Sequence, residues 1–411
     1  MSRLPRLLLS WIAFLSCTAA YALGSTAPAK QDVLSAADHP YFERVLQLVH
    51  ALDEGELRQQ LLACKDKPIT PSEFSIAHRG APLGYPEHTL EGYIAAARMG
   101  AGVIECDVTF TQDGHLVCRH SQCDLHRTTN ILKTPLASQC TQTFRPARAG
   151  HPAEAKCCTS DITLAQFRKL CGRRDQVSPA ANTVAEYLHE LPSPVSAEPV
   201  SCGTLMTHAE SIALIDQLGA SFIPELKAPQ VAMPFRGMSQ ADYANKMLGE
   251  YTTAGINPQR VSPQSFVFTD IQHWIAQSPA FADQVVYLDP RGRQVGFRPS
   301  LADMQTLRAQ GVTTLAPPIP MLLQLDDQGR IQATDYARYA HQAGLKLMTW
   351  TFENGAATDP DNWLYRSLPQ YVQHESQILE VLHALHTQAG ISGIFSDWPA
   401  TTTYYANCFD L

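Results

Sequence analysis

The chain has 411 residues, of which 45% are hydrophobic and 17% are charged, and its formal net charge at pH 7 is −8. This composition is that of a globular protein, and the length suits a barrel of alternating strands and helices folded as one domain. The negative charge, together with the lack of a basic cluster interleaved with aromatic residues, argues against a nucleic-acid partner.

The first 22 residues are typical of a secretory signal peptide. Two arginines precede an apolar run from residue 7 to residue 20, and a small-x-small cleavage pattern ends at Ala22. The run is short for a membrane span, and a lipoprotein signal ending at Cys17 is disfavoured because the preceding residues fit a lipobox badly. We therefore expect an exported protein, periplasmic or secreted, with no stable membrane insertion after cleavage.

The cysteines support export. Of the 11, ten remain after the signal containing Cys17 is removed, and an even number favours disulfides. Six lie in or beside a stretch rich in Pro, Ser and Ala at about residues 121–203, where disulfides would hold a segment that lacks a core. A zinc cluster is the competing interpretation, although paired C-x-x-C units are absent. The pairing is open, and Cys106 is expected to be a small buried hydrophobe.

Residues 23–73 are expected to form a linker and one or two helices that close the lower end of the barrel, since apolar residues recur at helical spacing over 39–63. A strand over 74–78 and a helix over 89–99 follow. The next strand, 103–110, turns tightly into residues 115–120 as a hairpin.

After the 121–203 insertion, in which short helices are expected over 164–170 and 184–191, the alternation becomes regular. Helices are predicted over 209–218, 241–254, 271–277, 301–310, 335–343 and 376–388, and strands over 221–226, 261–267, 285–288, 313–316, 346–352 and 393–395. With one barrel strand from the hairpin, the count is eight. This pattern predicts an α/β fold, a (β/α)8 barrel of the TIM type over residues 74–403, followed by a tail at 404–411.

Polar side chains occupy the ends of several predicted strands, where barrel enzymes carry their sites. They are His78, Asp107, Glu225, Lys227, Gln264, Trp350 and Asp397. Because side chains alternate along a strand, Glu105 and Asp107 point to the same side. Two adjacent carboxylates repel each other, and a hard divalent cation such as calcium or magnesium would remove that cost.

The ordered motifs resemble those of the glycerophosphodiester phosphodiesterase family over roughly residues 74–400. They are HRG at 78–80, PEHT at 86–89, ECD at 105–107, TQDG at 111–114, His120 with LHRTT at 125–129, PELK at 224–227, TWT at 349–351 and FSDWP at 395–399. The chain departs from the family pattern at Ser121, where the family usually has Asp, and at His88, where Asn is more common.

The resemblance implies hydrolysis of small-molecule glycerophosphodiesters to glycerol 3-phosphate and an alcohol. It implies metal ligation by Glu105, Asp107 and Glu225 of one divalent cation, with calcium favoured and magnesium possible. It further implies that His78 and His120 act as general base and general acid. Substrate contacts are expected from Arg79, Glu87, Lys227 and Trp350.

Two alternatives stay open. The first is a phospholipase-D-like enzyme on the same barrel that forms a cyclic phosphate from choline lipids. The second is a secreted binding protein that kept the barrel without its chemistry, although neither histidine and none of the three carboxylates is missing. The sequence does not decide the oligomeric state.

Overall fold

The computed structural model describes residues 35–411, apart from residues 38, 196 and 295–296. The expected signal peptide at residues 1–22, the cysteine within it and most of the expected linker lie outside the described residues. Among the described residues, no helix is both long enough and apolar enough to cross a membrane.

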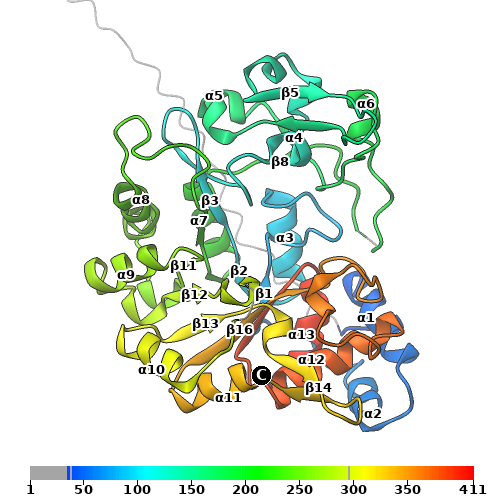
Figure 1. The fold of residues 1–411 in the computed structure, drawn as a ribbon. Coiled ribbons are helices and arrows are strands. Elements are labelled where there is room, and N and C mark those ends of the chain that lie inside the picture. The colour runs from blue at the N-terminus through cyan, green and yellow to red at the C-terminus, as the bar shows by residue number, and fades with distance from the viewer. Residues whose placement is uncertain (1–34, 38, 196, 295–296) are drawn as a thin grey trace, which may run out of the picture. The chain divides into compact units, whose positions relative to one another are not determined.

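Parallel strands form the centre of the molecule (Figure 1). They are β1 (Ser72–Ala77), β2 (Ala101–Ile104), β3 (Asp107–Phe110), β9 (Ser221–Phe222), β10 (Glu225–Leu226), β11 (Gln264–Ser265), β12 (Val286–Leu288), β13 (Thr314–Ala316), β16 (Lys346–Phe352) and β17 (Gly393–Ser396). β2 and β3 are halves of one strand, as are β9 and β10, because the Glu225 amide donates to the Cys106 carbonyl across both breaks (3.0 Å). Since β2 also pairs with β9 and β3 with β10, the sheet closes into the predicted eight-stranded barrel.

Helices cover the outside of the barrel. They are α3 (Leu90–Arg98), α7 (His208–Gln217), α8 (Gln240–Thr253), α9 (Phe268–Gln277), α10 (Leu301–Ala309), α11 (Asp335–Gln342), α12 (Ile378–Thr387) and α13 (Pro399–Cys408). Several begin at a hydroxyl residue; Thr207 and Ser239, for example, close capping boxes with Glu210 and Asp242. The segment expected as a C-terminal tail therefore begins inside the largely buried helix α13.

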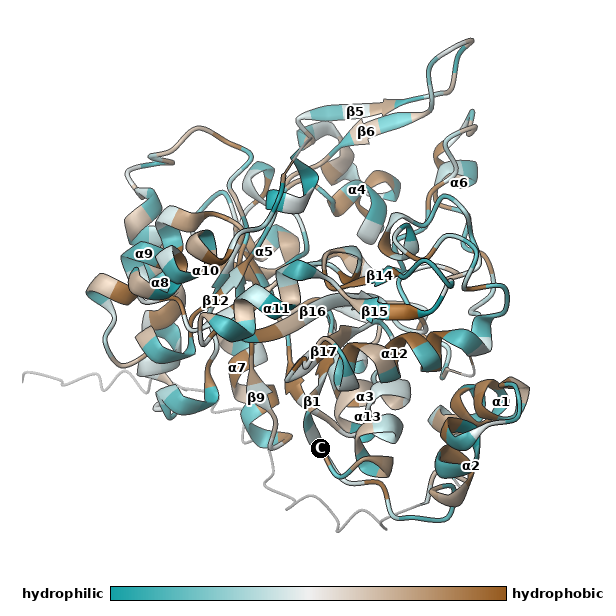
Figure 2. Ribbon diagram, turned by 60° about the horizontal axis from the view of Figure 1, so that its bottom comes forward, coloured by the Kyte–Doolittle hydropathy of each residue, from teal (hydrophilic) through white to brown (hydrophobic). Residues whose placement is uncertain are grey.

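Apolar side chains fill two layers. One small cluster, which includes Ile76, Val103, Ile223 and Phe395, lies among the barrel strands. A much larger cluster lies between the strands and the helices and includes residues of α12 and α13. Figure 2 shows hydrophobic residues gathered along the central strands, with hydrophilic residues on the outer loops. The apolar runs that predicted strands thus become buried on both faces, as in other parallel barrels.

The sequence predicts that the N-terminal helices close the lower end of the barrel, but α1 (Glu43–Ala51) and α2 (Glu56–Ala63) do not. They lie along α13. The Tyr404 hydroxyl donates to the Leu61 carbonyl (2.5 Å), and a disulfide joins Cys64 to Cys408. At the other end of this contact, the Trp398 indole donates to the Tyr41 carbonyl (3.0 Å). The apolar side chains of these two helices pack against the outer helix α13 and not against the lower end of the barrel.

Removing the Cys64–Cys408 disulfide should lower stability strongly. The two residues are 344 positions apart, so the crosslink restricts nearly the whole unfolded chain. We expect the double variant Cys64→Ser/Cys408→Ser to lose roughly 2–5 kcal/mol, measured as a lower midpoint of urea unfolding. Cys171→Ser/Cys202→Ser, which opens a crosslink between residues only 31 apart, should lose less. Equal midpoints for the wild type and the first variant would contradict this account.

The insertion is a small subdomain beyond the β3–β4 hairpin, at the top of Figure 1. After β4 (Leu116–Cys118) it contains α4 (Leu125–Thr128), β5 (Gln142–Arg145), β6 (Glu154–Lys156), α5 (Leu164–Phe167), β7 (Cys171–Gly172), α6 (Val184–Tyr187) and β8 (Gly203–Thr204). The expectation that it lacks a core was wrong, because Leu125, Ile131, Phe167 and neighbouring residues form a separate buried cluster. A further short hairpin, β14 (Leu323–Leu325) with β15 (Ile331–Ala333), lies between β13 and α11.

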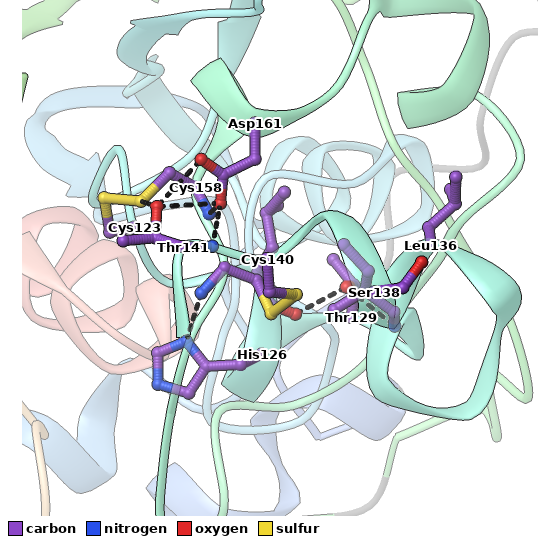
Figure 3. The surroundings of a disulfide bond; sticks show 12 residues. Cys123, His126, Thr129, Leu136, Ser138, Cys140, Thr141, Cys158 and Asp161 are labelled. Atoms are coloured by element: carbon purple, nitrogen blue, oxygen red, sulfur yellow. Dashed lines mark hydrogen bonds between the residues drawn. A yellow bond between two sulfur atoms is a disulfide. The ribbon is translucent and has the colours of Figure 1, made fainter. Parts of the chain in front are cut away.

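All ten cysteines of the described residues form disulfides. Besides Cys64–Cys408, the pairs are Cys106–Cys118, Cys123–Cys158, Cys140–Cys157 and Cys171–Cys202. Cys106 is therefore not a free buried thiol, because it crosslinks the β3–β4 hairpin. Figure 3 shows the neighbouring Cys123 and Cys140 bridges, beside which Asp161 accepts from the Thr141 hydroxyl (2.8 Å). Three of these crosslinks join parts of the insertion to one another, and the Cys106–Cys118 bridge closes the hairpin that precedes it.

Candidate active site

Three carboxylates meet at the breaks in two neighbouring barrel strands. Glu105 lies in the break between β2 and β3, Asp107 begins β3, and Glu225 begins β10 in register with Asp107. The three residues are 2%, 1% and 6% exposed. One oxygen from each lies within 4.8 Å of the others. Strand pairing therefore brings together residues more than a hundred positions apart in the sequence.

The charges of this acidic triad (Glu105, Asp107 and Glu225) are incompletely balanced. Burial raises the pKa of Glu105 well above its ordinary value, and Asp107 and Glu225 raise it further. Burial also raises the pKa of Glu225 to about 7, although Lys227 opposes the shift. Burial alone would raise the pKa of Asp107, but Lys227 and His88 outweigh it and hold that pKa well below the ordinary value.

The triad fits a divalent cation. Lys227 Nζ lies 2.6 Å from Glu225 Oε1 but 3.7 Å from Asp107 Oδ1, and the latter atom has no hydrogen-bond partner among the described residues. A single ammonium thus leaves one carboxylate oxygen unsatisfied and two carboxyls with raised pKa values. Buried oxygen ligands of this kind suit calcium or magnesium, whose charge would stabilise all three carboxylates in ionised form.

His78 follows β1 directly and lies beside the triad. Its Nδ1 is 2.5 Å from Asp397 Oδ1, and Asp397 Oδ2 accepts from the Asn354 amide (2.8 Å). Because a carboxylate only accepts, this contact places the proton of a neutral ring on Nδ1 and leaves the Nε2 lone pair free. That Nε2 lies 4.0 Å from Glu105 Oε2. The arrangement suits a side chain that removes a proton next to the triad.

Arg79 is held by two carboxylates. Its backbone amide donates to Glu105 Oε2 (2.9 Å), and its Nη1 donates to Glu87 Oε2 (3.0 Å). The other oxygen of Glu87 accepts from Arg119 Nη2 (2.9 Å), a fully buried guanidinium that sequence analysis did not single out. Two arginines hold the pKa of Glu87 well below its ordinary value, although burial opposes this. The position of an arginine directly after the apolar strand β4 was the available signal for Arg119.

His88 is a second residue whose role sequence analysis missed. Its Nε2 lies 2.8 Å from Asp107 Oδ2, and its Nδ1 lies 2.9 Å from the Tyr93 hydroxyl. Burial lowers the pKa of His88, so a neutral ring donates from Nε2 to Asp107 and accepts from Tyr93. The backbone of His88 has φ +51°, a region in which Asn is also well tolerated. The departure from the family's Asn at this position was the signal.

Replacing His88 should change cation binding through Asp107. We expect His88→Leu to weaken affinity about 10- to 100-fold, because Asp107 loses the donor that orients it. His88→Asn should bind nearly as well as the wild type, since Asn tolerates the backbone and keeps an amide donor. The measurement is the calcium concentration that half-saturates thermal stabilisation of each purified protein. Equal calcium responses in the Leu variant and the wild type would show that His88 does not orient the ligand.

Two cavities open at this end of the barrel. The one beside the triad has a volume of about 260 Å³. Its polar wall includes His78, Arg79, Lys227 and His120, and its apolar wall includes Trp350. Burial lowers the pKa of His120 well below its ordinary value, and Arg79 and Lys227 lower it further.

Trp350 is fixed as part of the apolar wall of this cavity. Its indole nitrogen donates to the Ala316 carbonyl (2.8 Å), and its ring packs edge-on against Phe266 and Trp363. The guanidinium of Arg293, which sequence analysis did not single out, lies over both Trp350 and Phe266. Most of the sequence-predicted site residues line this one cavity: His78, Arg79, Glu105, His120, Glu225, Lys227 and Trp350. Asp107 is not part of its lining but lies beside Glu105 and Glu225, and Glu87 lines the neighbouring cavity.

Comparison with known proteins shows to which family the chain belongs. The profile of the glycerophosphoryl diester phosphodiesterase family matches residues 78–401. A curated protein from Arthroderma benhamiae, named only as an extracellular protein, is 39% identical over 244 residues, which are 58% of this chain and all of that protein. A glycerophosphodiester phosphodiesterase from Bacillus subtilis is 42% identical over 69 residues, which cover 16% of this chain and 23% of that enzyme.

Solved structures support the fold. A protein from Silicibacter pomeroyi superimposes with a TM-score of 0.55 at 20% identity, covering 84% of this chain and 94% of that one. One from Agrobacterium tumefaciens superimposes with a TM-score of 0.50 at 18% identity, covering 82% and 96%. At these identities the likeness concerns the barrel itself.

Proposed function

The chain belongs to the glycerophosphoryl diester phosphodiesterase family of enzymes, and from this premise we propose that it hydrolyses glycerophosphodiesters to glycerol 3-phosphate and an alcohol with the aid of one divalent cation. The observation that carries the proposal is the buried acidic triad beside the His78–Asp397 pair. The oxygen ligands suit calcium or magnesium, and the resemblance to exported members of the family makes calcium the favoured cation and magnesium the second choice.

The substrate's phosphate would lie between the positively charged side chains of Arg79 and Lys227. Arg79 and Lys227 both face the cavity beside the triad, and their side chains can donate to phosphoryl oxygens. Glu87, itself held by Arg119, fixes the Arg79 side chain, so little conformational freedom is lost when the phosphate binds. A bound cation supplies further positive charge where negative charge grows on the phosphoryl group. Trp350 offers a flat apolar surface to the glycerol carbons.

Two histidines would move the protons. His78, with Nδ1 held by Asp397, accepts a proton at Nε2 from the attacking group, which is either water or the substrate's own glycerol hydroxyl. Attack by the glycerol hydroxyl gives a cyclic phosphate that water then opens. His120 donates a proton to the departing alkoxide. In the free protein its pKa is lowered by burial and by Arg79 and Lys227. A phosphodiester bound to those two cations offsets their charge and therefore favours the protonated ring.

The protein is proposed to act outside the cytoplasm. Five disulfides within the described residues are typical of an oxidising compartment. The long match to a relative named as extracellular supports the same location. These features and the signal-like N-terminal sequence together support our proposal of a periplasmic or secreted enzyme.

Chelation followed by re-addition of single cations tests the proposal. Purified protein stripped with EDTA should lose turnover of glycerophosphoglycerol and regain it with calcium, and less fully with magnesium. The product to measure is glycerol 3-phosphate. Parallel assays on sphingomyelin, with detection of a cyclic phosphate, test the phospholipase-D-like alternative. The proposal would be overturned if the protein hydrolysed no glycerophosphodiester at all, whether with calcium, magnesium or zinc.

A further inference from the structure

A second, larger cavity of about 760 Å³ lies where the insertion meets the mouth of the barrel. From the barrel side it is lined by residues such as Leu83, Glu87 and Asp397. From the insertion it is lined by Ser121, Cys123, Asp124, His126, Arg127, Arg174, Asp175, Gln176 and Pro194, and Gln230 of the loop after β10 completes the wall. The insertion therefore builds about half of a cavity that a bare barrel would not have.

We name this space of about 760 Å³ the head-group cavity. It joins the cavity of about 260 Å³ beside the triad, which we name the catalytic cavity. Arg79, His120 and Asn354 line both of them. His120, which would protonate the departing oxygen, thus stands at the boundary. The acidic triad and the apolar wall with Trp350 lie on one side of His120, and the insertion lies on the other side.

The wall of the head-group cavity is rich in hydrogen-bonding groups of both signs. Asp175 Oδ1 accepts from Arg127 Nε (2.8 Å), and Arg174 donates to the Leu191 carbonyl. The Gln230 side-chain amide donates to the Ser121 hydroxyl (2.6 Å), which leaves its carbonyl oxygen free to accept. Asp124, 6% exposed, accepts from the Ser121 amide (2.8 Å). No Phe, Tyr or Trp is among the described residues that line this cavity.

We propose that the head-group cavity binds the departing alcohol and selects an uncharged polyol, such as glycerol or inositol, over choline. The inference rests on the proposed hydrolysis of glycerophosphodiesters. Hydroxyl groups both donate and accept, so a polyol can meet the carboxylates, guanidinium groups and amide around it. A trimethylammonium group donates no hydrogen bond and is bound best by aromatic faces. In this wall Arg127 also balances the charge of Asp175, with which it forms an ion pair.

The first test compares substrates that differ only in the alcohol. Wild-type enzyme with calcium is assayed on glycerophosphoglycerol, glycerophosphoinositol, glycerophosphocholine and the methyl ester of glycerol 3-phosphate. We expect kcat/KM for the two polyol esters to exceed that for the choline ester at least about tenfold, because a site built for hydroxyl groups leaves its polar groups unpaired with choline. A preference for the choline ester would overturn the inference while leaving the hydrolase function intact.

The second test locates the selectivity in the insertion and its facing loop. Asp175→Ala and Gln230→Ala should each lower kcat/KM for glycerophosphoglycerol about tenfold and that for the methyl ester no more than about threefold. Glu154→Gln, an exposed carboxylate on β6 away from the cavity, is the matched control. Equal losses on both esters would mean that the cavity does not hold the alcohol. If the wild-type enzyme hydrolysed none of these esters, the hydrolase function itself would instead be refuted.

Discussion

Asp107→Asn is expected to abolish the response to divalent cations and to lower kcat about a thousandfold or more. Asp107 is the residue on which the site converges, because His88 and Lys227 both contact its carboxylate and Glu225 lies opposite it on the paired strand. A cation that stabilises phosphoryl charge is worth several kcal/mol, and each factor of ten in rate corresponds to about 1.4 kcal/mol. The measurement is kcat on glycerophosphoglycerol across a calcium titration.

Thermal stabilisation by calcium gives a readout of the same ligand set without turnover. Ligand binding to the folded state raises the unfolding temperature of the wild type, and Asp107→Asn or Glu105→Gln should remove that rise. Glu73→Gln is the control, because Glu73 is an exposed carboxylate on β1 that contacts Ser221 away from the site. If Asp107→Asn kept both calcium-dependent turnover and calcium-dependent stabilisation, the triad could not be the metal site.

The barrel could be predicted because its signals are local. Apolar runs of strand length alternate with amphipathic segments from residue 209 onward, and each becomes a strand or helix within a few residues of its predicted bounds. Alternation along the strand also predicted that Glu105 and Asp107 share a side, and both face the site although the strand breaks between them. The polar strand ends Gln264 and Asp397 proved to contact Glu105 and His78.

The remaining features depend on contacts between distant residues. Nothing in the spacing of ten cysteines pairs Cys106 with Cys118, because that bridge follows from the antiparallel register of β3 and β4. The insertion's core is assembled from short elements whose apolar residues show no period. Arg119 and Asn354 carry no motif, and their roles appear only when Glu87 and Asp397 are brought beside them. The position of α1 and α2 likewise depends on an outer helix at the opposite end of the chain.

His120→Ala should lower kcat by about 10²- to 10⁴-fold on natural glycerophosphodiesters, the usual contribution of a general acid or base. The loss should shrink strongly with a p-nitrophenyl ester of glycerol 3-phosphate, because a stable leaving anion needs no proton. His115→Ala is the control, since His115 is an exposed histidine on the same hairpin. Equal losses on the alkyl and p-nitrophenyl esters would show that His120 does not protonate the departing oxygen.

The pH dependence distinguishes an acid from a base at this position. An acid must carry its proton, and the pKa of His120 in the free protein lies well below the ordinary value because of burial, Arg79 and Lys227. Since kcat/KM reports the free enzyme, it should fall as the pH rises through this low pKa. In the complex the phosphate's negative charge raises the pKa, so kcat should persist to higher pH. A kcat/KM that instead rises with pH through the same range, and loses that rise in His120→Ala, would make His120 the base and shift the acid's role to His78.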